Sequence, residues 1–478
     1  MRLDHFVTLT NELSAIPSTK AARVADTVRE MIRDGRLIAG DPLPSTRALA
    51  AELGVARGTV VTAYEQLDGE GYIETRHGRA SRVAVSLVGE REPGHAEVRA
   101  PQEQRGASRV SLVPGLPRIS AISTKEWRAA WRWAASRPLL DAFPDRLGEE
   151  ALRVQIARQL GFSRGFAPAV GDVIVTTGTS DSISVLVEAM GAGCRVAVET
   201  PGYRSGQKAA VSAGATLVPI GVDDEGLLLD ELVAGHRRAR IDVVMVTPSH
   251  QYPLGGVMPL ATRQRLLAWA AAEDVLVVED DYDSEFRHTG APLPALAAID
   301  SAGVVAHIGS FSKMLNPQLR TGYLVTPPHG VVADRLRAVR DARGAAVAVP
   351  VQDAVARLLA TGAVRRHIAR MRRDYAHKRE LVQRMLSGIR GVHVGALAGG
   401  LHAVVTWDGA ANGAGSGPDL VTRLEAQGVE VAALEDYAVD GAHPAADGIV
   451  LGYGHVSATA LGAALEVIVR ELRGPGAP

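Results

Sequence analysis

The side chain best suited to covalent chemistry in this sequence is a lysine that follows a predicted strand. The apolar run 303–308 is predicted to be a buried strand, and Gly309-Ser310-Phe311-Ser312-Lys313 comes directly after it. Only five of the 52 Lys and Arg residues are lysine. A lysine amine can lose its proton and form an imine, whereas an arginine guanidinium stays charged. Lys313 is therefore a candidate imine-forming residue, although most lysines are only surface charges.

Four more predicted strands end in residues that could serve the same chemistry. They span 172–176, 195–198, 241–246 and 275–278. The polar and aromatic residues that follow these strands are Gly178, Thr179, Ser180, Tyr203, His250, Asp280 and Tyr282. Because the carboxyl ends of parallel strands meet at one edge of a sheet, these side chains are expected to lie close to Lys313.

Together these residues match what pyridoxal 5′-phosphate requires of a protein. The cofactor needs an imine-forming amine, an acid that keeps its ring nitrogen protonated, an aromatic ring beside it and a helix start that binds phosphate. Taken singly, each residue has a simpler interpretation: Asp280 as a strand-end acid, His250 as a packed histidine, Tyr203 as a core or interface side chain. Their joint occurrence favours a cofactor site.

The region from residue 110 onward is predicted to be an α/β domain, because its apolar strands alternate with helices. Polar residues at several strand ends indicate a large, mostly parallel sheet. From about residue 345 the pattern changes to helices, a strand at 399–405 and a closing helix at 458–472. Residues 345–478 are therefore predicted to form a smaller α+β subdomain of the same domain.

The first 85 residues predict a winged helix-turn-helix. Ser45 is suited to cap a short helix at 46–53, a glycine makes the turn, and a second helix spans about 57–67. Two alternating segments, 71–75 and 81–85, then predict a hairpin that would form the wing.

The residues placed to contact DNA share positions at helix starts and at the hairpin tip. They are Ser45, Thr46, Arg47, Arg57, Thr59, Thr62, Arg76, His77 and Arg79. Such positions are where phosphates and base edges are reached. The net charge of −1 gives no global attraction to nucleic acid, so the prediction depends on this local placement. A helical module that binds another protein is the alternative.

The remaining stretches define the domain organisation and the cellular compartment. Residues 86–109 are rich in Pro, Gly and charged side chains and predict a flexible linker between residues 1–85 and 110–478. The one cysteine, Cys194, fits a reducing compartment. No stretch has the apolar core of a signal peptide or approaches the ~18 apolar residues of a membrane helix. We expect a cytoplasmic protein without a membrane partner, and no spacing typical of metal ligands is visible.

The motifs resemble two known families. Leu43-Pro44-Ser45-Thr46-Arg47 and Glu70-Gly71-Tyr72-Ile73, with the helices between them, resemble the winged helix of GntR-type regulators. Residues 110–475 resemble a fold-type I, class I aminotransferase domain, above all in Glu279-Asp280-Asp281-Tyr282-Asp283 and in the Lys313 segment. The fusion of the two resembles the MocR type of bacterial transcriptional regulator.

This resemblance implies roles for the candidate residues. Lys313 would hold pyridoxal 5′-phosphate as an internal aldimine, and Asp280 would pair with the pyridine nitrogen. Tyr282 would lie near the phenolic oxygen with His250 nearby, and Tyr203 would flank the ring. The residues implied to bind the phosphate are Gly178, Thr179, Ser180, Ser310, Ser312 and Arg320. The aminotransferase fold also implies a homodimer.

The chain departs from the family pattern in three places. Ser205 stands where some members have an arginine, and Arg204 is displaced by one position. The predicted strand at 448–453 holds no arginine, although aminotransferases place a carboxylate-binding arginine near there. The usual turn before the first large helix is altered at 143–148.

These departures separate three functional hypotheses. The first is a transcriptional regulator that binds operator DNA and senses a small amine, or the vitamin B6 cofactor itself, through an aminotransferase-like domain. The second is a catalytically active aminotransferase with an attached DNA-binding domain, which the missing arginine disfavours because donor and acceptor both need their carboxylates held. The third is a cofactor-free scaffold. The first explains both halves of the chain.

Overall fold

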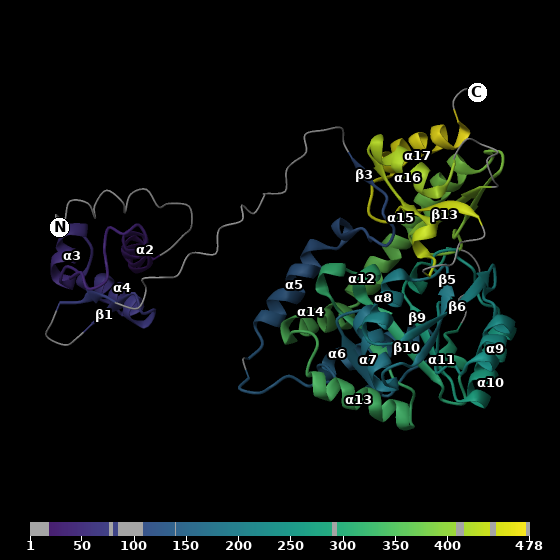
Figure 1. Cartoon of the computed structure of the whole chain (residues 1–478), viewed down its shortest axis with the longest axis horizontal. Helices are drawn as coiled ribbons and strands as arrows, with labels where there is room; N and C mark the ends of the chain where they lie inside the picture. The colour runs from purple at the N-terminus through teal and green to yellow at the C-terminus, as the bar shows by residue number, and fades with distance from the viewer. Residues whose placement is uncertain are drawn as a thin grey trace. The chain divides into compact units, whose positions relative to one another are not determined.

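The computed structural model describes residues 19–75, 80–84, 109–138, 140–288, 294–407, 415–439 and 446–474. The chain divides into two compact units, residues 1–105 and 106–478, which are treated separately below (Figure 1).

The first unit is a small helical domain with a two-stranded hairpin. Its elements are α2 (Lys20–Arg33), α3 (Thr46–Leu53), α4 (Arg57–Gly69), β1 (Ile73–Glu74) and β2 (Arg82–Val83). Helix α3 begins where predicted because the Ser45 side chain accepts a hydrogen bond from the backbone N–H of Ala48. It ends at Gly54, whose φ of 60° is the left-handed conformation that glycine adopts easily.

The helices of this unit enclose a small hydrophobic core. Leu49, Val60 and Leu67 are fully buried, while Leu53 and Val55 are half-buried against them. The two strands pair antiparallel, as a wing requires, with Ile73 opposite Val83. They are shorter than the predicted segments, and the hairpin tip, residues 76–79, lies outside the described residues.

The second unit is built on an eight-stranded sheet in the order β4-β11-β10-β9-β8-β5-β6-β7. The strands are β4 (Val173–Thr176), β5 (Arg195–Thr200), β6 (Thr216–Asp223), β7 (Gly226–Leu227), β8 (Val243–Val246), β9 (Leu276–Asp281), β10 (Val305–Ser310) and β11 (Gly322–Val325). The pairs from β10 through β6 are parallel, which confirms the mostly parallel sheet. Strand β11 is antiparallel to both β10 and β4. The carboxyl end of β4 therefore lies on the same edge as those of β5, β8, β9 and β10.

Helices cover both faces of this sheet (Figure 1). They are α5 (Thr124–Ala135), α6 (Glu150–Ser163), α7 (Thr179–Met190), α8 (Arg204–Ser212), α9 (Leu229–Arg238), α10 (Leu260–Glu273), α11 (Leu296–Ile299), α12 (Phe311–Met314), α13 (Val331–Arg343) and α14 (Val349–Ala360). Neighbouring residues of one strand enter opposite cores, since successive side chains point to opposite faces. Val196 packs with α7, α8 and α13, whereas Ala197 packs with α9, α10 and α11.

A smaller antiparallel sheet, in the order β12-β13-β16-β15, follows in the chain. Its elements and neighbours are α15 (Ala363–Leu386), β12 (Val392–Gly395), β13 (His402–Trp407), α16 (Gly417–Ala426), β14 (Val429–Glu430), β15 (Ala432–Ala433), β16 (Asp447–Gly452) and α17 (Ala458–Arg473). Strand β3 (Val110–Ser111), at the start of the unit, pairs with β14. Helix α14, which lies near the predicted start of the small subdomain, packs against α5 and α6 and also against α15. Within the described residues, no helix is both long and apolar enough to cross a bilayer.

Candidate functional site

A cavity of about 490 Å³ opens at the carboxyl ends of the parallel strands. The predicted site residues that line it are Gly178, Thr179, Ser180, Tyr203, Asp280, Tyr282, Ser310, Ser312, Lys313 and Arg320. They come from the ends of β4, β5, β9 and β10 and from the turn before β11. The structure thus brings together ten residues from segments as much as 140 positions apart, as expected for a site at this edge.

Lys313 lies in the short helix α12, which begins at Phe311 because Ser310 accepts a hydrogen bond from the Ser312 N–H. Its ammonium group donates a hydrogen bond to the backbone oxygen of Gly115. Burial lowers the pKa of Lys313, while the charges of Asp283 and Asp280 act in the opposite direction. A lowered pKa increases the fraction of neutral amine, the form that can attack a carbonyl group.

Asp280 is the cavity residue that most clearly indicates a bound partner. Its side chain is 4% exposed, and its Oδ1 atom has no hydrogen-bond partner among the described residues. Burial, followed by the neighbouring charges of Asp281, Glu199 and Asp283, raises the pKa of Asp280 to about 8. A buried acid without a partner is costly. A protonated ring nitrogen would supply the missing donor, so this residue fits the cofactor predicted from the sequence.

The opposite end of the cavity has the features of a phosphate site. Helix α7 begins after Gly178, whose φ of 124° and missing side chain leave the first amide groups of the helix accessible. A Cβ atom on Gly322 would lie 2.8 Å from the Cα atom of Gly178, so position 322 requires glycine, whereas at Gly178 the positive φ favours it. The hydroxyl groups of Ser310 and Ser312 and the guanidinium of Arg320 line the same cavity.

His250 is the one predicted cofactor-site residue that stands outside the lining of the cavity. It does not line the cavity but lies behind Tyr282, whose hydroxyl group is 2.9 Å from His250 Nδ1. The same nitrogen is 3.1 Å from Asp283 Oδ2. His250 would therefore act on a bound molecule through Tyr282 rather than by contact. A motif fixes the order of residues but not which of them faces the cavity.

Sequence reasoning missed several residues of the cavity. Tyr252, His402 and Tyr437 line it, as does Arg204, which forms an ion pair of 3.1 Å with Asp436. Tyr252 belongs to a motif that the sequence shows, whereas Asp436 and Tyr437 carry no local signal. Strand β16 contributes no side chain to this lining, in agreement with the arginine missing from its sequence.

The structure also assembles a possible set of metal ligands that spacing could not predict. The ligand atoms of His250, Asp283 and His402 lie within 4.8 Å of one another. Each of these side chains has a protein partner, since His402 Nε2 lies 2.9 Å from the backbone oxygen of Pro253. The cluster is thus explained by hydrogen bonding, and the three residues come from distant segments.

The candidate DNA-contact residues of the first unit differ in accessibility. Arg47, Arg57 and Thr62 are exposed, whereas Thr46 and Thr59 are half-buried. Ser45 is exposed too, but its hydroxyl group caps α3. The Tyr64 hydroxyl donates a hydrogen bond of 2.9 Å to the backbone oxygen of Pro44 and so ties α4 to the turn before α3. Arg76, His77 and Arg79 lie outside the described residues.

Comparisons with known proteins agree with both halves of this description. Residues 20–83 match the bacterial regulatory proteins of the gntR family, and residues 119–439 match the aminotransferases of class I and II. The HTH-type pyridoxine biosynthesis transcriptional regulator PdxR of Corynebacterium glutamicum is 37% identical over 446 residues, which cover 92% of each chain. The chain belongs to the MocR type of GntR-family regulators. The probable rhizopine catabolism regulatory protein MocR of Rhizobium meliloti is 34% identical over 74% of each chain.

Solved structures place the second unit of this MocR-type regulator in the aminotransferase fold. The multiple substrate aminotransferase of Thermococcus profundus matches with a TM-score of 0.69 at 22% identity, over 77% of this chain and 92% of that one. Membership of the family establishes a transcriptional regulator with a DNA-binding helix-turn-helix, and pyridoxal 5′-phosphate as the cofactor of the aminotransferase-like domain. When bound, this cofactor supplies a carbonyl group that condenses with amines and a ring that withdraws electrons.

The raised pKa of Asp280 predicts a pH-dependent stability of the cofactor-free protein. Because the pKa rises from near 3.9 in the unfolded chain to about 8 in the folded one, the folded state loses stability as the pH rises from 4 to 8. The loss between pH 6 and 8 is at most about 3 kcal/mol. Asp280→Asn has no proton to lose, so we expect it to raise the Tm of the cofactor-free protein more at pH 9 than at pH 6.

Thermal unfolding at the two pH values measures this difference. Adding pyridoxal 5′-phosphate should reverse the order of the two proteins at pH 9, because a protonated ring nitrogen pairs with a carboxylate better than with an amide. An equal change in Tm at both pH values would contradict the buried, unpartnered state of Asp280.

Proposed function

We propose that this regulator binds its operator through α3 and α4 and changes its affinity for DNA when a small amine, or the cofactor itself, occupies the cavity of the second unit. One observation supports this proposal most. The cavity has residues that fit the cofactor, but β16 contributes no arginine to its lining. Such a site can bind an amine but lacks the usual means of holding the two carboxylates of a transamination cycle.

Each cavity residue has a proposed role in this function. Lys313 carries the cofactor covalently, Asp280 holds the ring nitrogen protonated, Tyr203 flanks the ring and Tyr282 approaches the phenolic oxygen. The proposed phosphate ligands are Gly178, Thr179, Ser180, Ser310, Ser312 and Arg320. Arg320 adopts φ 46°, a conformation unusual for a residue with a side chain, which suggests that its position is functionally constrained.

Arg204 is the proposed partner for a carboxylate on the effector. It belongs to α8 next to the large sheet, and its ion-pair partner Asp436 belongs to the small subdomain. Both side chains are about half exposed, at 49%, so an incoming carboxylate can compete with Asp436. A carboxylate that displaces Asp436 would break this contact between the two subdomains. Such a ligand would bind the arrangement without the contact more tightly than the arrangement with it. A conformational response requires this difference in affinity.

The DNA-binding assignment predicts a defined loss of affinity. Arg57→Ala should weaken binding to the DNA upstream of the protein's own gene by about tenfold or more, since a base-edge or phosphate contact is worth roughly 1–3 kcal/mol. Fluorescence anisotropy with and without pyridoxal 5′-phosphate gives both the affinity and its dependence on the cofactor. Arg36→Ala, which removes a partly exposed arginine paired with Asp34, is the matched control. Intact binding by Arg57→Ala would refute the assignment of α4.

The effector assignment predicts a selective loss of affinity in Arg204→Gln. Amines with a carboxylate should bind about tenfold more weakly than to the wild type, because a charge-assisted hydrogen bond is lost. The corresponding amines without a carboxylate should bind equally to both proteins. Absorbance titration of the cofactor measures both series. An equal loss in the two series would argue against a carboxylate at Arg204, and sustained turnover with several amino acids would instead support a working aminotransferase.

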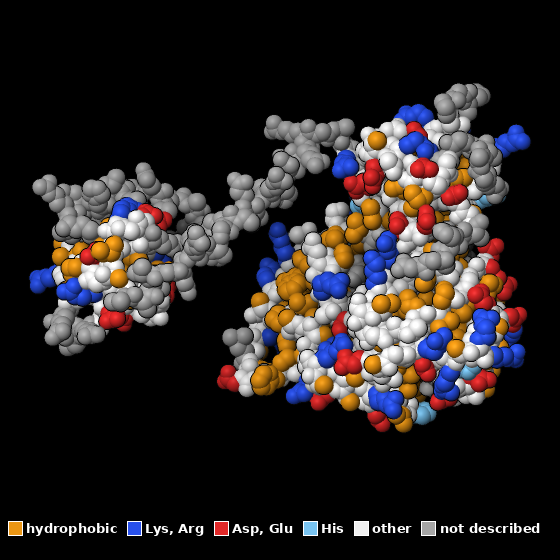
Figure 2. All heavy atoms as spheres, in the orientation of Figure 1, with side chains coloured by type: hydrophobic (Ala, Val, Ile, Leu, Met, Phe, Trp, Pro, Cys, Tyr) orange, Lys and Arg blue, Asp and Glu red, His pale blue; other side chains and the backbone are white. Residues whose placement is uncertain are grey.

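A homodimer is proposed from an apolar segment on the second unit. Leu140 is 76% exposed and Phe143 is 99% exposed. Hydrophobic side chains gather along the edge of this unit that carries α5 (Figures 1 and 2). Large apolar side chains so exposed on a folded unit mark interaction surfaces, and in the aminotransferase fold this region is expected to meet a second copy of the chain.

Phe143→Asp should therefore shift the protein from dimer to monomer in sedimentation velocity, because it places a charge in an apolar interface. Leu260→Asp is the matched control, since Leu260 is 46% exposed but begins α10, a helix of a different face. Dimers that survive Phe143→Asp but not Leu260→Asp would show that the interface lies elsewhere.

A further inference from the structure

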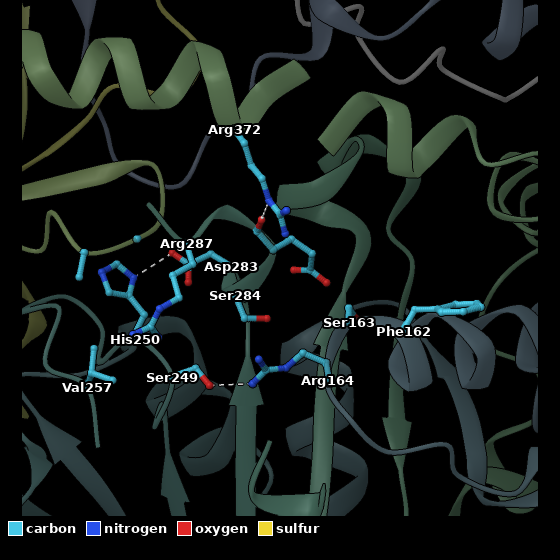
Figure 3. Close-up of a pocket in the computed structure, with 13 residues that line it drawn as sticks. Phe162, Ser163, Arg164, Ser249, His250, Val257, Asp283, Ser284, Arg287 and Arg372 are labelled. Carbon is cyan, nitrogen blue, oxygen red and sulfur yellow. Dashed lines mark hydrogen bonds and ion pairs between the residues drawn. The ribbon is translucent and has the colours of Figure 1, made fainter. Parts of the chain in front are cut away.

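A second cavity, of about 300 Å³, lies beside the cofactor cavity and shares no lining residue with it. Its walls come from the end of α6, the loop after β8, the segment after β9 and helix α15 (Figure 3). Asp280 and Tyr282 line the cofactor cavity, whereas residues 283–285 line the second one. The segment that follows β9 therefore separates the two cavities.

Three guanidinium groups from three different elements line this second cavity. They belong to Arg164 at the end of α6, Arg287 after β9 and Arg372 on α15. Figure 3 shows Arg164 and Arg372 approaching Ser284 from opposite sides, with Arg287 on the side of His250. Arginines and hydroxyl groups converging on one space are a typical receptor for a carboxylate or phosphate, because the planar guanidinium binds two oxygens at once.

Arg164 already has two acidic partners, Asp281 and Glu279. Arg164 is held by Asp281, with 2.6 Å between Nε and Oδ2, and its Nη2 donates to the Ser249 hydroxyl at 2.7 Å. Asp283 is 3.1 Å from His250. Burial, and then the charge of Asp281, raise the pKa of Glu285, which favours its neutral form.

The cations of the cavity also act on one another. Burial, and then the positive charge of Arg164, lower the pKa of Arg287. The Nε atom of Arg372 donates to the backbone oxygen of Glu285 rather than to a carboxylate. An anion placed among these groups would relieve the repulsion between Arg164 and Arg287. The electrostatics of the lining therefore favour a negatively charged occupant.

Two buried polar atoms of the lining lack partners in the described part of the chain. They are Ser284 Oγ and His250 Nε2, and the His250 side chain is only 4% exposed. Buried polar atoms are nearly always hydrogen-bonded in folded proteins, to protein, to ordered water or to a ligand. An oxyanion that accepts a hydrogen bond from the Ser284 hydroxyl would satisfy one of them.

We propose that the second cavity binds a small molecule through a carboxylate or phosphate group, and that its occupancy is transmitted to the cofactor cavity. The transmission follows a continuous set of contacts: Asp283 to His250, then His250 Nδ1 to the Tyr282 hydroxyl at 2.9 Å, and Tyr282 to the cofactor. The binding site itself does not depend on the proposed regulatory function. The second part, the effect on the cofactor, rests on the proposed contact between Tyr282 and the cofactor.

The test uses the full-length protein with pyridoxal 5′-phosphate bound, so that the cofactor's own phosphate site is filled. Isothermal titration with inorganic phosphate and, separately, with succinate shows which oxyanion is preferred. We expect saturable binding of at least one, and a loss of about tenfold or more in Arg287→Gln, because a charge-assisted contact is removed. Arg335→Gln, an exposed arginine of α13, should bind like the wild type.

Arg372→Gln provides a second variant in case Arg287→Gln fails to fold, which the absorbance of the bound cofactor reveals. Tyr282→Phe should keep the anion affinity but lose the change in cofactor absorbance that the anion causes. No saturable binding of either probe, or binding unchanged in both arginine variants, would overturn the site. An absorbance change that persists in Tyr282→Phe would overturn the transmission. Failure of this site would leave cofactor binding and DNA binding intact, so it is distinguishable from failure of the proposed function.

Discussion

A buried carboxyl group without a hydrogen-bond partner, that of Asp280, is the constraint from which the site of the second unit is best understood. Removing an acid from water raises its pKa and costs free energy unless a donor meets it. Among the described residues, no donor reaches its Oδ1 atom, so a bound molecule with a suitable donor would stabilise it. Asp280 destabilises the folded protein when the cavity is empty. Binding of a partner molecule in the cavity would therefore raise the stability of the fold.

Strand β9 organises both cavities through the alternation of its side chains. Asp280 and Tyr282 line the cofactor cavity, whereas Glu279 contacts the buried His307 and Asp281 contacts the buried Arg164 on the other side. Residues just beyond the strand then line the second cavity. Because successive residues of a strand point to opposite faces, a short acidic stretch can serve two sites at once. The same stretch makes the two cavities neighbours, so a shift of this stretch at one cavity would be felt at the other.

The elements and the central residues were predictable because their signals are local. Helix α3 carries its own cap, the apolar strands of the large sheet alternate with helices, and the motif around Lys313 stands directly after a strand. The contacts between distant segments were not predictable. The pair Arg204–Asp436 joins residues 232 positions apart, and the antiparallel insertion of β11 leaves no trace in its apolar sequence. The sequence also could not show that His250 contacts Tyr282 without lining the cavity, because only packing decides which motif residues face a cavity.

The first strand of the second unit, β3, is followed closely by Gly115. The hydrogen bond between Lys313 and Gly115 therefore connects the site to the beginning of this unit. Strand β3 pairs with β14 of the small subdomain, and four residues later the backbone oxygen of Gly115 accepts from Lys313 Nζ. Once the nitrogen of Lys313 is engaged by the cofactor it has fewer protons to donate, so this anchor must loosen or rearrange. The anchored segment follows β3, which is the first described element of the second unit. Cofactor binding would therefore change how the first segment of this unit is held against the site.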